Sequence, residues 1–144
     1  MKFTLKIQKD REEELLIYAH EDRPVFEEIR RMLQCPEQTL VGYNEENIVI
    51  LSPAETVCFI TEKDRVYALV GKKRYLVKKR LYQIEELLNR DYVRINQGCI
   101  ANLKQISRFA VSIGGSLEVI FSNGYRDFVS RRELKKVKER IGIV

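Results

Sequence analysis

The sequence has little of what catalysis usually requires. Its 144 residues include a single histidine, His20, and three cysteines, Cys35, Cys58 and Cys99. A cysteine–histidine nucleophile could be built only through His20, and no cysteine lies near it in the chain. Neither glycine-rich phosphate-binding pattern, G-x-x-x-x-G-K-[ST] or G-x-G-x-x-G, occurs. The sequence therefore predicts a protein that is not an enzyme and that uses no cofactor.

Other absences bear on location. An odd number of widely separated cysteines favours neither a disulfide framework nor a zinc site. The longest apolar runs are only a few residues, too short to cross a membrane, so no membrane insertion is expected. The first eight residues alternate between polar and apolar and lack the apolar block of a signal peptide. Free thiols without an export signal predict a cytoplasmic protein.

Charge is abundant and unevenly distributed along the chain. The formal net charge is +5. Residues 1–45 carry seven lysines and arginines against ten acidic residues, a net charge of −3, whereas residues 46–144 carry nineteen against eleven, a net charge of +8. Such a basic portion indicates a polyanionic partner, although a solvated basic surface without a partner would have the same composition.

The N-terminal residues 1–38 have the pattern of a small β-β-α extension. Alternation at residues 3–7 and an apolar run at 15–19 predict two strands. Apolar residues at helical spacing after Pro24 predict a helix that stops before Pro36. We interpret this extension as a candidate dimerisation or packing element for residues 39–144.

From residue 39 onward the pattern is that of short antiparallel strands. Polar tips at 44–47 and 62–64 and the pair Asn123-Gly124 predict hairpins. The capping box Ser130-Arg-Arg-Glu133 predicts a helix that Gly142 ends. The expected fold class is α+β, mainly antiparallel β. The expected strands outside the stretch 91–106 are 40–43, 48–51, 56–61, 65–70, 74–77, 107–113, 117–121 and 125–129, with a short helix at 81–88.

The stretch 91–106 is predicted to present a loop on a rigid mount. A strand is interrupted by Asn96-Gln97-Gly98, and the chain then returns to the core. We expect both amides to lie exposed at the tip, where they offer the paired donor and acceptor that read adenine in a major groove. Asn102, in contrast, is expected to be buried and to fix the loop by hydrogen bonds.

Basic residues gather at predicted loop tips and at the start of the last helix. Arg131 and Arg132 occupy its first turn, where the helix dipole disfavours cations. Contact with phosphates or bases would offset this cost. No helix–turn–helix pair is readable, so reading of a groove is expected to come from loops. Aromatic residues spread through strands favour duplex over single-stranded nucleic acid.

These residues match a known family. The stretch Arg94-Ile-Asn-Gln-Gly-Cys-Ile-Ala-Asn-Leu-Lys-Gln-Ile106 resembles the Arg-x-His-x-Ser-x-x-x-Asn-x-x-x-Ile signature of the LytTR DNA-binding domain. Residues 115–124 and 128–136 resemble its last hairpin and final helix entry, and residues 81–88 its short helix. The resemblance covers roughly residues 39–141.

The resemblance implies an elongated β-domain whose loops enter successive major grooves of promoter DNA at direct repeats. It also implies a homodimer, with an unknown protein partner a further candidate for signal input. By position, Gln97 and Arg132 would read bases, whereas Arg94, Lys104 and Ser130 would contact the DNA backbone. The full set of expected contacts is Lys63, Asp64, Arg65, Arg94, Asn96, Gln97, Gly98, Lys104, Ser130, Arg131, Arg132 and Lys135.

Two departures from the family pattern limit what carries over. Asn96-Gln97-Gly98 replaces the common His-Arg-Ser or His-Asn-Ser, so the target sequence is not inherited. No receiver domain precedes the LytTR-like part, so a stand-alone regulator without phosphorylation control is expected. The leading interpretation is a sequence-specific transcriptional regulator that binds double-stranded DNA. The alternatives are a protein-interaction or assembly module with an incidental basic surface, and an RNA-binding protein.

Overall fold

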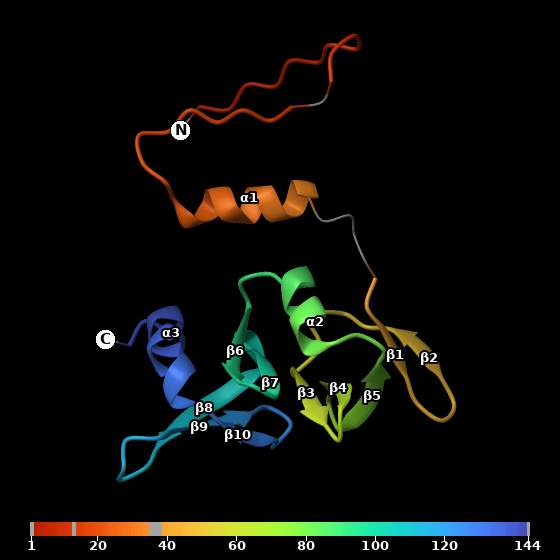
Figure 1. Ribbon diagram of the computed structural model, residues 1–144, viewed down its shortest axis with the longest axis vertical. Helices are drawn as coiled ribbons and strands as arrows, with labels where there is room; N and C mark the ends of the chain where they lie inside the picture. Colours follow the sequence, from red (N-terminus) through yellow and green to blue (C-terminus); the bar gives the residue numbers. More distant parts are fainter. Residues whose placement is uncertain (1, 13, 35–38, 144) are drawn as a thin grey trace.

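The computed structural model describes residues 2–12, 14–34 and 39–143 and is mainly antiparallel β (Figure 1). Hairpins connect most of its strands, as the predicted polar tips require. In chain order the elements are α1 (Pro24–Gln34), β1 (Val41–Tyr43), β2 (Ile48–Ile50), β3 (Cys58–Glu62), β4 (Arg65–Val70), β5 (Lys73–Val77), α2 (Leu81–Leu87), β6 (Tyr92–Asn96), β7 (Cys99–Asn102), a 3₁₀ turn (Leu103–Gln105), β8 (Ile106–Val111), β9 (Leu117–Phe121), β10 (Arg126–Phe128) and α3 (Arg131–Ile141).

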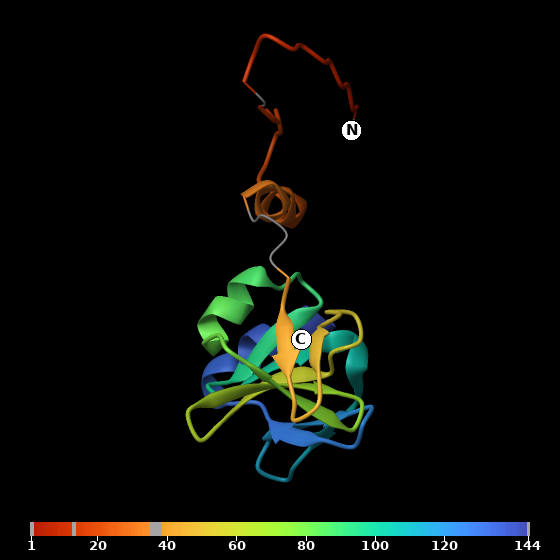
Figure 2. The same cartoon turned by 90° about the vertical axis from the view of Figure 1, so that its right-hand side faces the viewer.

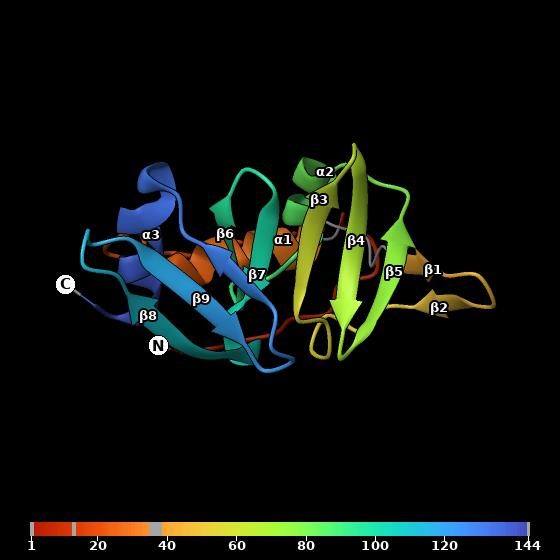
Figure 3. The ribbon, with the colours of Figure 1, turned by 90° about the horizontal axis from the view of Figure 1, so that it is seen from below.

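The strands form two antiparallel sheets. The larger sheet has the order β2-β1-β5-β4-β3-β7-β6, and the smaller has the order β10-β9-β8. Figure 3 shows them spread side by side, with β4 and β5 on the far side of β3 from β7. Because most neighbours in the larger sheet are joined by tight turns, loops collect along its two opposite edges.

Each face of the larger sheet buries its own apolar cluster, as the two-residue period of a strand requires. On one face, Phe59 and Ile100 pack with Ile84 of α2. On the other, Ile95 packs with Val119 of β9 and with other members of a cluster that includes α3. The sheet is thus covered on both faces, and the predicted α+β class is confirmed.

Most predicted elements of residues 39–143 are present within a residue or two of the expected ends. The helix over Arg131–Ile141 ends at Gly142 in the left-handed conformation, with φ of 79°. The capping box, however, is wrong. Ser130 is the N-cap residue, but its side chain makes no capping hydrogen bond. Instead its backbone amide donates to the carbonyl of Ile95 at 2.8 Å, so β6 fixes the helix start.

The N-terminal extension departs from the prediction. Helix α1 forms, but residues 2–12 and 14–23 contain no strand, so the strands predicted at 3–7 and 15–19 are wrong for this chain. Both segments are extended arms beyond α1 (Figures 1 and 2). An extended segment becomes a strand only through hydrogen bonds to a neighbour, and neither arm has such a neighbour within the described residues. The predicted stop before Pro36 lies outside the described residues.

Helix α1 contacts the rest of the protein through an ion pair between Glu28 Oε1 and Arg90 Nε, 3.5 Å apart. Both side chains are close to half exposed, so this pair contributes little to stability. None of the helices in the described ranges is long and apolar enough to span a membrane.

Candidate nucleic-acid interface

Three loops from distant parts of the sequence lie along one edge of the protein. They are the β3–β4 turn, the β6–β7 turn and the start of α3, which line the upper edge in Figure 3. We call this the loop edge. It gathers most of the residues that the sequence singled out as DNA contacts.

The β3–β4 turn places Lys63 and Asp64 at an exposed tip. Glu62 pairs with Arg65 across the two strands, so the turn contains only two residues. Lys63 has φ of 50° and Asp64 has φ of 62°. Positive φ at both positions is the type I′ geometry that matches strand twist and that normally selects Asn-Gly. A lysine there is strained, and such strain is typical of functional sites.

Of the two amide side chains in the β6–β7 turn, that of Gln97 is exposed and that of Asn96 is hydrogen-bonded within the protein. The Asn96 amide nitrogen donates to Asp127 Oδ1 at 3.0 Å and to the Phe128 carbonyl at 2.8 Å. Its oxygen accepts from the Gly98 backbone amide at 2.8 Å. The expectation that both amides are exposed is therefore wrong for Asn96, whose side chain fastens the turn. Gln97 is exposed at the tip.

Arg94 supports this turn from below. Its Nε donates to Glu85 Oε2 at 3.0 Å, and its guanidinium donates to the Gln97 carbonyl at 3.0 Å. Its side chain is only 20% exposed. These bonds hold Arg94 between α2 and the β6–β7 turn. Its guanidinium is therefore less available to a ligand than that of an exposed, unpaired arginine.

The start of α3 presents two adjacent arginines. Arg131 and Arg132 are exposed in its first turn, and Lys135 is exposed one turn later. The amide of Ser130 is taken by β6, as described above, so this end of the helix cannot shift independently of the β6–β7 turn. The backbone that carries these cations is thus tied to β6, the strand that leads into Gln97.

Hydrogen bonds join the three loops into one unit. The Thr61 amide at the end of β3 donates to the Gly98 carbonyl at 2.8 Å, which links the β3–β4 hairpin to the β6–β7 turn. Asn96 and Ser130 link that turn to the segment entering α3. Since these bonds involve backbone groups of all three loops, their spacing is set by the fold.

The loop edge carries basic residues that have no acidic partner. Two nearby carboxylates have partners of their own, because Glu62 pairs with Arg74 and Glu85 pairs with Arg94. Within the described ranges, no salt bridge involves the exposed cations of this edge, which are Lys63, Arg65, Arg131, Arg132 and Lys135. A duplex surface would find these charges free to pair with phosphate.

A second basic group lies on the same edge and was not among the predicted contacts. The pairing of Val66 with Val77 brings the segment 78–80 beside Arg65. There Lys78, Lys79 and Arg80 line an open groove of about 640 Å³ together with Arg65 and Gln83. The sequence displayed this basic cluster, but only the β4–β5 register places it next to the predicted tip.

Lys104, in contrast, is not brought to the loop edge. It follows β7, at the end of that strand opposite Gly98, and its Nζ lies 3.5 Å from Asp91 Oδ2. The structure thus places Lys104, which was expected to contact the DNA backbone, apart from the tip residues by the length of β7. Asn102 is buried, and its amide donates to the Thr56 carbonyl at 2.9 Å. Its predicted structural role is confirmed.

Possible metal ligands and the cysteines are the remaining groups to consider. Among the described residues, no cluster of three histidine, cysteine or acidic side chains could hold a metal ion. Cys58 and Cys99 are free and buried. A hydrogen bond that the Cys99 thiol donates to Cys58, together with burial, raises the pKa of Cys99 well above its usual value, which keeps this thiol protonated.

Comparison with known proteins decides the family. Residues 46–142 match the model of the LytTr DNA-binding domain. The chain belongs to the LytTr DNA-binding domain family. The resemblance seen in the sequence is thereby confirmed, and DNA binding is the property that defines this family.

Relatives and a solved structure agree with this assignment. Uncharacterized HTH-type transcriptional regulators of Staphylococcus aureus strains NCTC 8325, COL and MRSA252 are 30% identical over 105 residues, which cover 73% of this chain and 71% of each relative. A LytTr DNA-binding domain of a putative methyl-accepting/DNA response regulator from Bacillus cereus superposes with a TM-score of 0.68. The match covers 74% of this chain and 99% of that domain at 16% identity. At this identity the likeness shows the shared fold.

Although those relatives are named HTH-type, no two helices in the described part of this LytTr protein follow one another without intervening strands. Any groove contact along the loop edge would therefore come from turns and from the first turn of α3.

Proposed function

We propose that this LytTr protein is a transcriptional regulator that binds double-stranded DNA sequence-specifically and reads major grooves through the loop edge. The observation that carries the proposal is that Gln97 and Arg132 are both exposed on backbone segments that hydrogen bonds tie together. A backbone that is already ordered loses little entropy on binding, so more of the interaction energy of its side chains becomes affinity.

The two residues suit two different bases. A glutamine amide can pair bidentately with adenine, and an arginine guanidinium with guanine. Each such pair contributes about 1–3 kcal/mol of discrimination. Because the Asn96 side chain is already hydrogen-bonded within the protein, it is not available to read a base. Gln97 is therefore the base-reading amide of the turn.

The surrounding cations would position the protein on the duplex. Phosphate contacts fix register and orientation without carrying sequence information. We assign this role to Lys63, Arg65, Arg131 and Lys135 and extend it to the group at 78–80. Tandem sites in promoter DNA, arranged as direct repeats, are the proposed targets.

Selection from a random duplex library, followed by fluorescence anisotropy titration, tests the proposal. We expect one enriched motif that binds at least a thousandfold more tightly than random duplex at physiological salt. Gln97→Ala and Arg132→Ala should each relax preference at one base position. The Lys104→Ala variant is the matched control, because this exposed cation lies away from the loop edge, and it should leave both affinity and preference unchanged.

Equal binding of random and selected duplexes would overturn the sequence-specific reading. The proposal expects structured RNA to compete poorly, because the major groove of A-form RNA is not accessible to these loops. Stronger competition by structured RNA than by duplex DNA would therefore favour the RNA-binding alternative.

A further inference from the structure

The N-terminal arms and α1 expose apolar side chains that nothing in the described protein covers. Ten large apolar residues between positions 3 and 33 are exposed, with Phe3 at 82% and Ile7 at 83%. Scattered apolar residues are ordinary on a surface, but a contiguous set marks an interaction site. The set is Phe3, Leu5, Ile7, Leu15, Leu16, Ile17, Tyr18, Val25, Met32 and Leu33.

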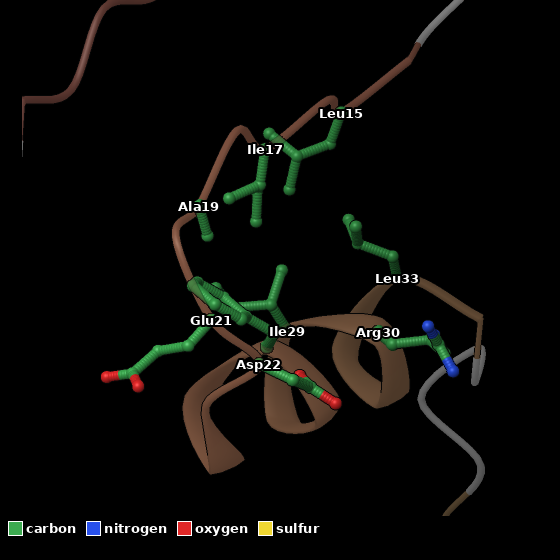
Figure 4. Close-up of a pocket in the computed structure, with 9 residues that line it drawn as sticks. Leu15, Ile17, Ala19, Glu21, Asp22, Ile29, Arg30 and Leu33 are labelled. Carbon is green, nitrogen blue, oxygen red and sulfur yellow. The ribbon is translucent and has the colours of Figure 1, made fainter.

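Part of this surface forms an open pocket. Leu15, Ile17 and Ala19 of the second arm face Ile29 and Leu33 of α1 across a cavity of about 590 Å³ (Figure 4). No residue of the first arm, 2–12, lines this cavity. The arm and the helix therefore make two walls of an apolar core whose third wall is missing.

The first arm has the pattern of that missing wall. Phe3, Leu5 and Ile7 alternate with polar residues, so one face of this arm in extended form is wholly apolar. Two extended segments alone are marginally stable in water and gain stability from further strands or from packing against a helix. One chain supplies only two arms, and two copies supply four.

We propose that residues 2–8 of a second copy of this chain fill the pocket between residues 15–19 and α1, and that the exchange is mutual. Each copy would then donate one arm and accept one, which is the self-complementary arrangement of a two-fold dimer. The unpaired backbone groups of the arms would acquire strand partners in the same step.

Charge complementarity favours a second copy. In residues 2–9 the only charged side chains are Lys2, Lys6 and Lys9, whereas in residues 12–22 every charged side chain is acidic. Glu21 and Asp22 line the pocket, together with Arg30, which pairs with Glu27 at 3.4 Å. The donated arm would thus bring lysines to a rim that holds two carboxylates, which an unrelated apolar peptide would not do.

The area approaches that of a stable interface. Full burial of an aliphatic or phenylalanine side chain removes roughly 60–120 Å² of apolar surface. In the exchanged arrangement each copy contributes six exposed apolar side chains, which are Phe3, Leu5 and Ile7 of its arm and Leu15, Ile17 and Leu33 of its pocket. These six offer on the order of 360–720 Å² per copy, compared with about 800 Å² per partner in a standard stable interface.

Sedimentation and light scattering of the full chain test the proposal. We expect a dimer in the wild type and a dimer Kd raised by roughly tenfold or more in Leu5→Asp and in Ile7→Asp. The control Ile113→Asp changes a fully exposed apolar residue between β8 and β9 and should leave the dimer intact. A wild-type chain that is monomeric at all concentrations, or a dimer that tolerates Leu5→Asp and Ile7→Asp, would overturn the proposal.

Cross-linking distinguishes exchange from self-filling. In a Cys35→Ser background, chains carrying Leu5→Cys and differently tagged chains carrying Leu33→Cys should form a disulfide between the two tags. If one chain carrying both cysteines instead closes on itself, its own arm fills the pocket and the proposal fails. The combination Lys2→Glu/Lys6→Glu should weaken the dimer, and mixing with Glu21→Lys/Asp22→Lys chains should restore it. Absence of restoration would contradict the role of charge.

The proposal goes beyond DNA recognition and does not depend on it. Because the variants lie outside the loop edge, their monomers should still bind a single DNA site. Loss of dimerisation with DNA binding intact, and loss of DNA binding with the dimer intact, are separate outcomes.

Discussion

Replacement of Asn96 by alanine should reveal the difference between a residue that holds the loop edge and one that reads DNA. The substitution removes three hydrogen bonds, to Asp127 Oδ1, to the Phe128 carbonyl and from the Gly98 amide. Each typically contributes about 0.5–1.5 kcal/mol net. Asp127 keeps its bond from the Phe128 amide at 2.8 Å, and the freed groups lie near solvent, so values at the low end apply. We expect the free energy of unfolding to fall by about 2 kcal/mol.

The same variant should bind DNA more weakly without changing its preference. Once Asn96 no longer fastens the turn, the loops must be ordered during binding, and this ordering costs affinity. The selected and random duplexes should weaken by similar factors, because Gln97 and Arg132 remain. Urea denaturation and anisotropy titration of the same preparation provide both measurements.

Gln97→Ala is the matched control for Asn96→Ala. Its side chain is exposed, so stability should change by no more than about 0.5 kcal/mol. Preference at one base position should nevertheless relax. If Asn96→Ala leaves stability unchanged but alters base preference, Asn96 reads DNA and our account of its three bonds is incorrect.

Three further predictions concern the edge and the core. Replacing Lys63-Asp64 with Asn-Gly should relieve the positive-φ strain and raise the free energy of unfolding in urea by about 1 kcal/mol. The same replacement should lower duplex affinity, and unchanged affinity would show that this turn lies outside the interface. Lys78→Ala/Lys79→Ala should weaken all duplexes alike and reduce the slope of log affinity against log salt by about two, and an unchanged slope would exclude phosphate contacts there. Burial raises the pKa of Tyr92, so the folded state holds the phenol proton more tightly than the unfolded state does. This difference adds to the free energy of unfolding below about pH 10, and the contribution is lost as pH rises through the folded pKa. The urea midpoint should therefore fall above pH 10, and by less in Tyr92→Phe; an equal fall in both proteins would refute the contribution of Tyr92.

The sequence was sufficient to predict the β-domain because its information is local. Hairpin tips such as Asn123-Gly124 and the alternation of Leu117, Val119 and Phe121 specify strands and turns within a few residues. The same local rules located the candidate site, since its cations and amides lie at predicted turns.

Long-range contacts account for what could not be predicted. The partners of Asn96 lie more than thirty residues away, at Asp127 and Phe128, and no local pattern announces such a bond. The neighbourhood of Arg65 and the segment 78–80 depends on the β4–β5 register. For the N-terminal arms the alternating pattern was present, but strand formation depends on a partner that the pattern does not specify.

The hydrogen bonds that unite the loop edge also bear on how recognition could diverge among related proteins. Two of them join backbone groups, Thr61 to Gly98 and Ser130 to Ile95, and do not depend on the side chains there, whereas the others require the side chain of Asn96. The exposed positions 97 and 132 are therefore free to vary while the distance between them stays constant. Substitution there would change which bases of a promoter are recognised and preserve the number of base pairs between them. New target sequences would then differ in the recognised bases and share the spacing that the fold sets.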